Sequence, residues 1–373
     1  MKITSLILSN DRDTGVRILL LSGIAWLPLA VLSLIEGTFI TDDITIPFIK
    51  DVVPYVRGLV IIPLLVIADN IIEPMMERIV RYLRVSGVVP ESEQEPLNSA
   101  IDRMVHLINV KWIQLVLVML AILVSWWLRT DYVDMWKEDN VTSWALHLKD
   151  GKVDESMAGL WFLFITSPLL SFLFYRWIWR YIAWIVFLYR VSRLKLELYA
   201  SHTDLAGGLG IFGGAQSLFG ILFLVMAAMI SSQLANNVLY EGDALIDMRQ
   251  IILVFIVFSV ILIEAPLLFF TKTLYKLKRK ALAEYGALQH QISGDFHHHW
   301  ISEGSKKLVD SMQPSAMADY SAVYEVVSNM RIVPLNPKVI IVLAVILLLP
   351  FLPLALTEQS IWDVLKMIGD SVL

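Results

Sequence analysis

Apolar residues gather in seven long runs along the chain, and polar stretches separate these runs. A helix that crosses a bilayer needs about 20 mostly apolar residues, because hydrocarbon offers no partner for unpaired backbone groups. The pattern therefore predicts an all-α, polytopic membrane bundle of about seven transmembrane helices. The expected spans are 16–35, 58–78, 112–128, 158–178, 215–237, 251–271 and 338–356.

Basic residues alternate between the connections and indicate an orientation. Of the 30 Lys and Arg residues, 22 fall in the amino-terminal segment and in the second, fourth and sixth connections. Short loops rich in Lys and Arg stay in the cytoplasm, so the amino terminus is predicted to be cytoplasmic. The chain then divides into a six-span bundle over 1–271, a cytoplasmic helical connection over 272–336, and a seventh span with a carboxyl tail over 337–373.

Composition narrows the class of protein further. Hydrophobic residues make up 57% of the chain and charged residues only 17%, whereas soluble domains average about 45 to 50% apolar residues. The chain has no Cys, which excludes disulfides, thiolate metal sites and cysteine nucleophiles. It contains no Walker, dinucleotide or HExxH motif and no evident nucleophile with a base, so we expect neither an enzyme nor a cofactor. The net charge of −5 gives no indication of a nucleic-acid partner.

Three consecutive histidines, His297–His299, resemble a metal-binding run. Successive side chains on a helix point about 100° apart and do not converge on one ion. We therefore expect no metal site there.

The second predicted span carries two acidic residues, Asp69 and Glu73, four positions apart and thus on one helix face. If the span runs from 58 to 78, Asp69 lies near the bilayer centre, where a charge costs roughly 2.5 to 3.5 kcal/mol and must face protein or water. Alternatively, the spanning part ends near Ala68 and both carboxylates lie in water on an inner extension. The sequence leaves both interpretations open.

The fourth predicted span contains Arg176 and Arg180, also four positions apart. Long arginines at this depth commonly reach lipid phosphates, with tryptophans as interfacial neighbours. The alternative is an intramembrane charge cluster in which they pair with Asp69 and Glu73. Glu264 lies eight residues before Lys272 and is a further candidate for that cluster.

Residues 202–214, HTDLAGGLGIFGG, lie at the predicted cytoplasmic entrance to the fifth span. His202 and Asp204 are candidates for a junction or helix cap. Gly207, Gly208 and Gly210 allow two interpretations. Small residues let helices pack closely in membranes, whereas free amides at a helix start attract anions.

Two connections carry further expectations. The third connection is best interpreted as a solvated loop, and the alternative is that Trp136 and Trp144 in it are interfacial anchors. Glu325 and Arg331 precede the seventh span, and we expect them in a cytoplasmic connector that docks beneath the bundle.

Three stretches carry a resemblance to a known family: RWIWRYIAWIVFLYRVSRLKLELYASHTDLAGGLGIF, LAEYGAL and YEVVSNMRIVPLNP. Together they resemble an uncharacterised family of bacterial multi-spanning inner-membrane proteins with a His-x-Asp-x-Ala-Gly-Gly-Leu-Gly motif, over about residues 158 to 373. That family typically has His-Pro-Asp where this chain has His202, Thr203 and Asp204, and Phe where it has Ile211. The resemblance implies a bacterial inner-membrane location and brings no activity with it.

These features favour a homo-oligomeric passage for ions or small anions in the lipid bilayer. Its cytoplasmic vestibule would be formed by Arg176, Arg180 and the three glycines at the entrance to the fifth span. The alternative is a membrane-embedded signalling or effector subunit, controlled by a soluble cytoplasmic protein through the basic connection over 272–336.

Overall fold

A computed structural model describes residues 11–139, 142–149, 152–241, 245–302 and 313–354. Residues 1–10 of the predicted amino-terminal segment and residues 355–373 of the predicted carboxyl tail lie outside the described residues. The first half of the chain forms the following elements: α1 (Asp11–Ile35), η1 (Phe48–Lys50), α2 (Val52–Tyr55), η2 (Val56–Ile61), α3 (Ile62–Val85), η3 (Glu91–Glu93), α4 (Gln94–Asn109), α5 (Lys111–Asp139), β1 (Leu146–Lys149), β2 (Lys152–Glu155), α6 (Met157–Trp161), η4 (Phe162–Thr166) and α7 (Ser167–Val191).

The second half begins with an extended, hydrogen-bonded connection between α7 and α8. Its elements are α8 (Gly210–Leu218), α9 (Gly220–Asn236), η5 (Asn237–Glu241), α10 (Leu245–Glu264), η6 (Ala265–Phe270), α11 (Thr271–Phe296), η7 (His297–Ser302), α12 (Gln313–Ser328), α13 (Pro337–Leu348) and η8 (Leu349–Phe351).

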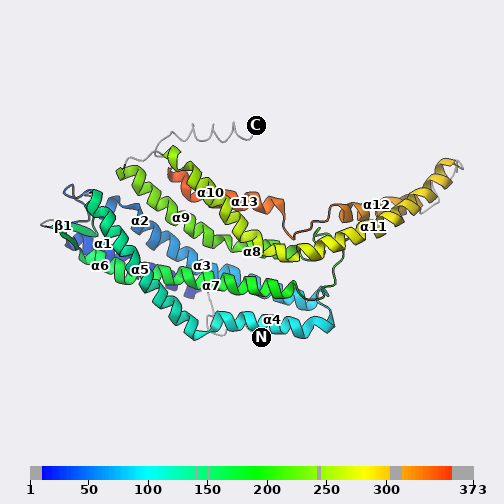
Figure 1. Cartoon of the computed structure of the whole chain (residues 1–373), viewed down its shortest axis with the longest axis horizontal. Coiled ribbons are helices and arrows are strands. Elements are labelled where there is room, and N and C mark those ends of the chain that lie inside the picture. Colours follow the sequence, from blue (N-terminus) through cyan, green and yellow to red (C-terminus); the bar gives the residue numbers. More distant parts are fainter. Residues whose placement is uncertain (1–10, 140–141, 150–151, 242–244, 303–312, 355–373) are drawn as a thin grey trace.

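The predicted all-α membrane bundle is confirmed. In the described part of the chain, six apolar helical stretches are long enough to cross a membrane. The pair α4 and α5, bent by 44° at its junction, makes a seventh if it is counted as one span. The long helices run side by side, and the small β1–β2 hairpin lies at one end of the bundle (Figure 1).

Several helices extend well past the predicted spans. The continuous stretch Val52–Val85 has 34 residues, or about 51 Å at 1.5 Å per residue, against a hydrocarbon core of about 30 Å. The stretch Met157–Val191 is similar, with 35 residues. Sequence hydropathy therefore located these helices but not their ends.

Two of these long helices contain a π-helical turn next to a proline. Pro63 follows η2, and Pro168 follows η4. Proline has no N–H and cannot form the usual bond to the carbonyl four residues earlier, so the wider turn accommodates the break without ending the helix.

The surface and the interior agree with a membrane setting. Large apolar side chains are exposed along α1, α5, α10 and α13, where they face lipid. The interior is closed by fully buried aromatic and aliphatic side chains from α3, α7, α8, α9 and η6, among them Trp177, Trp184, Phe187, Phe212 and Phe270.

The two ends of the bundle differ. At the hairpin end, the loop between α1 and α2 lies beside the hairpin, where Ile46 pairs with Ser143. At the opposite end, α11 follows α10 and η6 in one helical stretch and projects away from the bundle, with α12 packed against it (Figure 1). We refer to these as the hairpin end and the α11 end.

The orientation remains a prediction, and the absence of native Cys makes it testable by single-cysteine labelling. Asp43 is exposed at the hairpin end, and Gly294 is exposed on α11 with open space around its backbone. We expect an impermeant maleimide to label Asp43→Cys on intact cells, and to label Gly294→Cys only after permeabilisation. The reverse pattern would contradict the orientation indicated by the basic residues.

Candidate functional site

Charged side chains of three helices meet toward the α11 end. The charge cluster consists of Arg17 from α1, Asp69 and Glu73 from α3, and Arg176 and Arg180 from α7. Asp69 is its centre: one carboxylate oxygen lies 2.6 Å from Arg180 Nη1 and 3.0 Å from Arg176 Nη2, and the other lies 3.0 Å from Arg17 Nη2. Arg180 also contacts Glu73 at 3.0 Å.

The spacing of four on both α3 and α7 thus produces ion pairs, and the lipid-phosphate interpretation of Arg176 and Arg180 does not describe this arrangement. Asp69 is only 4% exposed, so its charge depends on these partners. Arg180 additionally lies over the Trp177 ring, 4.8 Å from its centre. Arg17 was not predicted to belong to this cluster, because it was counted among the basic residues of the amino-terminal segment.

The depth of the charge cluster follows from α1. Arg17 and Thr14, which accepts a hydrogen bond from Asn70, lie in the first turns of that helix. The exposed apolar surface of α1 begins there, with Val16 and Leu19. Asp69 therefore lies level with the start of the exposed apolar surface of α1, which favours a position near the edge of the span over one at its centre.

Glu264 does not belong to the charge cluster, which corrects the sequence-based grouping. It lies at the junction of α10 and η6, on the side of α7 where Tyr181 contacts the carbonyls of Leu262 and Ile263. It is 7% exposed, and neither carboxylate oxygen has a hydrogen-bond partner among the described residues.

The glycine-rich loop before α8 folds around its own aspartate. The Asp204 carboxylate accepts hydrogen bonds from the backbone N–H groups of Ala206 at 2.8 Å, Gly208 at 3.1 Å and Gly210 at 2.7 Å. Gly207 and Gly208 have φ of +68° and +98°, a backbone region that glycine enters without strain.

The anion-binding interpretation of these glycines was therefore wrong, because the amides of Gly208 and Gly210 already bind the carboxylate of the chain itself. Asp204 caps α8 although it lies six residues before Gly210, the first residue of that helix. Leu209 occupies the N-cap position, and its side chain forms no capping hydrogen bond. His202 lies beside it, with Nδ1 2.9 Å from Asp204 Oδ1.

Burial alone would raise the pKa of Asp204, but the backbone hydrogen bonds from Gly210, Ala206 and Gly208 outweigh it and hold that pKa below its ordinary value. The carboxylate form is thereby favoured.

This loop also joins distant segments of the chain. Tyr82 of α3 donates a hydrogen bond to the Gly208 carbonyl at 2.7 Å. Arg331 donates to the Asp204 carbonyl at 2.6 Å and from its backbone N–H to the Leu205 carbonyl at 2.7 Å. The connector before α13 thus docks on the glycine-rich loop through Arg331, whereas Glu325 is exposed on α12.

A second polar site lies toward the hairpin end and was not predicted. It is a cavity of about 170 Å³ between α2, η2, α5, the hairpin, η4 and α9, which we call the Arg57 pocket. Its lining residues are Asp51, Val53, Pro54, Arg57, Ser125, Ser143, Trp144, Ala145, Leu146, Glu155, Gly159, Phe162, Leu163, Ser167, Gln233 and Asn236.

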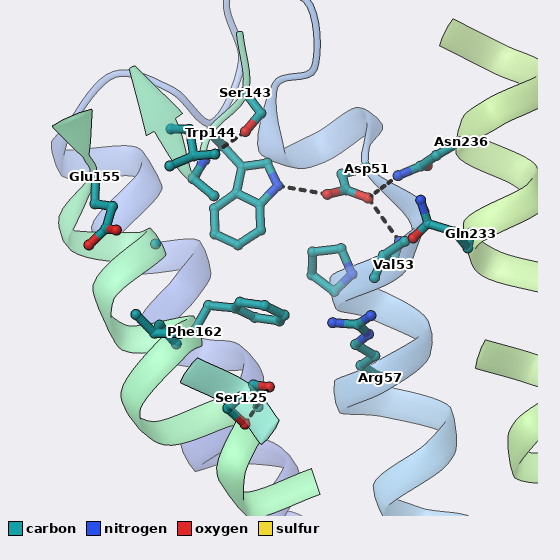
Figure 2. Close-up of a pocket in the computed structure, with 16 residues that line it drawn as sticks. Asp51, Val53, Arg57, Ser125, Ser143, Trp144, Glu155, Phe162, Gln233 and Asn236 are labelled. Carbon is teal, nitrogen blue, oxygen red and sulfur yellow. Dashed lines mark hydrogen bonds between the residues drawn. The ribbon is translucent and has the colours of Figure 1, made fainter. Parts of the chain in front are cut away.

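One wall of the Arg57 pocket is held by Asp51, whose carboxylate is fully engaged. It accepts hydrogen bonds from Trp144 Nε1 at 2.8 Å, Asn236 Nδ2 at 2.8 Å and the Val53 N–H at 2.9 Å (Figure 2). Trp144 is 4% exposed, so its interpretation as an interfacial anchor was wrong. The side chain of Trp136 lies outside the described side chains.

Arg57 enters this pocket from η2. Its guanidinium lies 5.3 Å from the centre of the Phe162 ring and forms no ion pair with a described residue; its Nε is buried without a hydrogen-bond partner in the described structure. Figure 2 shows the Glu155 carboxylate directed away from Arg57. The buried Oδ1 of Asn236 also has no partner among the described residues.

Arg57 lies inside a stretch that is long and apolar enough to cross a membrane, Val52–Val85. The neighbouring Gly58 packs so closely on Trp26 of α1 that an added Cβ would lie 2.8 Å from the Trp26 Cβ. Trp26 is nine residues before the end of α1, or about 14 Å at helical rise. The sequence signal was an arginine inside the apolar run VVPYVRGLVII, which was read as a loop charge because the predicted span began after it.

Comparisons of this chain with protein-family models, with curated proteins and with solved structures find no match. The resemblance to a family of bacterial membrane proteins stays a prediction. The class defined by the fold is therefore a multi-spanning helical membrane protein. The charge cluster and the Arg57 pocket are its two candidate functional sites.

Proposed function

We propose that this protein is a membrane passage for small anions, with the Arg57 pocket as its binding site toward the hairpin end. The observation that carries the proposal is the guanidinium of Arg57, which belongs to a stretch apolar enough to cross a membrane and lies in a cavity without an acidic partner among the described residues. A charge in such a position is costly, and intramembrane charges commonly mark ion or substrate paths.

The chemistry of the pocket favours a small anion. Guanidinium groups bind carboxylate and other oxyanions with two hydrogen bonds, and Asp51, the acid nearest in sequence, already accepts three. The volume of about 170 Å³ is below the roughly 300 Å³ at which drug-sized pockets begin. One copy of the chain lines the pocket, so the predicted homo-oligomer is not needed to form it.

The charge cluster supplies a second site with a net positive charge, centred on Asp69 further along the same continuous helix. Its three arginines face two acids, and Asp69 lies 12 residues after Arg57, or about 18 Å at helical rise. Between them, the buried apolar side chains of Ile61, Ile62 and Leu65 separate the two sites. We infer two anion-attracting sites with an apolar barrier between them, closed in this conformation.

Flux into liposomes tests this proposal. Purified protein should carry chloride, nitrate or acetate above the level of empty vesicles, and Arg57→Gln should lower that flux by about tenfold or more, because a hydrogen bond to a charged group contributes about 1.5 kcal/mol or more. Arg57→Lys, which keeps the charge, should retain part of the flux.

Arg84→Gln is the matched control, since Arg84 lies at the exposed end of the same continuous helix and contacts Asn98. It should leave the flux unchanged. Equal flux for Arg57→Gln and the wild type, or no anion flux from well-folded wild-type protein, would contradict the proposal.

One observation supports the second candidate function, a signalling or effector subunit. The pair α11 and α12 projects from the bundle (Figure 1), and the first turns of α11 present Lys272, Lys276, Arg279 and Lys280 together. Such a surface suits an acidic soluble partner. If wild-type protein conducts neither anions nor cations, this function becomes the better proposal. A location in the bacterial inner membrane belongs to both proposals.

A further inference from the structure

Glu264 lies at hydrocarbon depth. The exposed apolar surface of α10 continues past it, because Leu262 before it is 40% exposed and Leu268 after it is 57% exposed. Glu264 itself is turned inward and is 7% exposed. The carboxyl group is thus enclosed by protein between lipid-facing residues of the same helix.

The helix break at Pro266 determines which hydrogen bonds the neighbouring polar groups form. Pro266 has no N–H, so the carbonyl of Leu262 loses its usual helical donor. Tyr181 of α7 replaces that donor, with its hydroxyl 2.9 Å from the Leu262 carbonyl and 3.2 Å from the Ile263 carbonyl. Gln216 of α8 donates to the Ile263 carbonyl and to the Tyr181 hydroxyl.

These bonds leave no donor for Glu264. Gln216 is fully buried, and its carbonyl oxygen accepts from Trp184 Nε1 at 2.8 Å. Both oxygens of Glu264 are buried without a hydrogen-bond partner in the described part of the chain. A carboxylate in that setting would be an uncompensated buried charge, whereas the neutral acid avoids most of this cost.

Among the described residues, no cation pairs with Glu264 from the elements packed around it, including Lys272 in the first turn of α11. The sequences of α8, α9 and η6 contain no titratable residue, and α13 contributes Lys338 only at its exposed first turn. On α7, the Tyr181 hydroxyl lies close enough to Glu264 for the two groups to interact electrostatically. The charge cluster on α1, α3 and α7 is satisfied by its own members.

We propose that Glu264 is a proton-binding site within the membrane, occupied by a proton in the conformation described here. Loss of the proton places a negative charge beside the carbonyls of Leu262 and Ile263, which also carry partial negative charge. The junction of α10 and η6 then has to rearrange until water or a cation reaches the carboxylate. This inference goes beyond anion passage and does not depend on it.

Infrared difference spectroscopy of the purified protein in lipid bilayers tests the site directly. The wild type should show the carbonyl-stretch band of a protonated carboxyl that persists at neutral pH and disappears as the pH is raised further. Glu264→Gln should abolish this band. Glu325→Gln, which removes an exposed carboxyl on α12, should leave it unchanged.

Glu264→Asp keeps a carboxyl and should shift the band rather than remove it, which preserves the test if Glu264→Gln fails to fold. Hydrogen exchange over residues 262–272 gives a second readout once it is corrected for the intrinsic rise of amide exchange with pH. The corrected protection should fall with pH in the wild type and stay constant in Glu264→Gln. A band that Glu264→Gln and Glu264→Asp leave unaltered, or the absence of a protonated carboxyl at neutral pH, would overturn the proposal. Neither readout depends on anion flux, so failure of the proposed function is seen separately.

Discussion

Replacing Asp69 with Asn is expected to lower the free energy of unfolding by about 3 to 5 kcal/mol, the range found when one partner of a buried ion pair is removed. Asp69 is the acid that three arginines share, and it is 4% exposed. Its loss leaves Arg17 and Arg176 without an acidic partner among the described residues. A steric-trap assay in bicelles measures the change in the free energy of unfolding.

Coupling within the charge cluster is measured by a double-mutant cycle. Asp69→Asn combined with Arg176→Gln should recover part of the loss, because one uncompensated charge is removed with its partner. Glu77→Gln serves as the control two turns further along α3, since Glu77 forms no ion pair in the described structure. Strictly additive losses for Asp69 and Arg176 would show that the two side chains do not interact.

Replacing Asp204 with Ala is expected to destabilise the protein by about 1.5 to 3 kcal/mol, because the N–H groups of Ala206, Gly208 and Gly210 lose a charged acceptor together. The loss should appear as a lower thermal midpoint in detergent. Thr203→Ala, at an exposed neighbouring position, is the control and should have little effect.

The pH dependence of this contribution has a defined sign. Because the folded pKa of Asp204 lies below its ordinary value, its stabilising effect is complete above about pH 4 and is lost as the pH falls through the folded pKa. The difference in thermal midpoint between wild type and Asp204→Asn should therefore shrink in acid. A difference that is constant down to the lowest pH at which the protein folds would contradict the capping role.

Hydropathy predicted the bundle well because lipid imposes a length and an apolar composition on every span. The spacing of Asp69 with Glu73 and of Arg176 with Arg180 likewise predicted which side chains share a helix face. The ends of α3 and α7 were not predictable in the same way. A helix continues wherever its own residues allow, and nothing in its periodicity marks where lipid stops.

The features that sequence reasoning missed depend on contacts between distant segments. Trp144 is buried because the hairpin folds back over Asp51, 93 residues earlier. The amides of the glycine-rich loop are occupied because the chain reverses and brings them to Asp204. The sequence cannot show whether Glu264 pairs with a charged residue. Only the structure shows that Tyr181 and Gln216 form their hydrogen bonds with other groups and that Glu264 has no hydrogen-bond partner among the described residues.

The long helix that follows Glu264 also has a mechanical consequence. α11 contains 26 residues and η7 contains 6, so the two form an arm of about 48 Å at 1.5 Å per residue. A tilt of about 10° at η6 displaces the far end of this arm by about 8 Å. A rearrangement of a few hydrogen bonds around Pro266 is thereby amplified to nearly a nanometre at the tip, far enough to bring together or separate two protein surfaces.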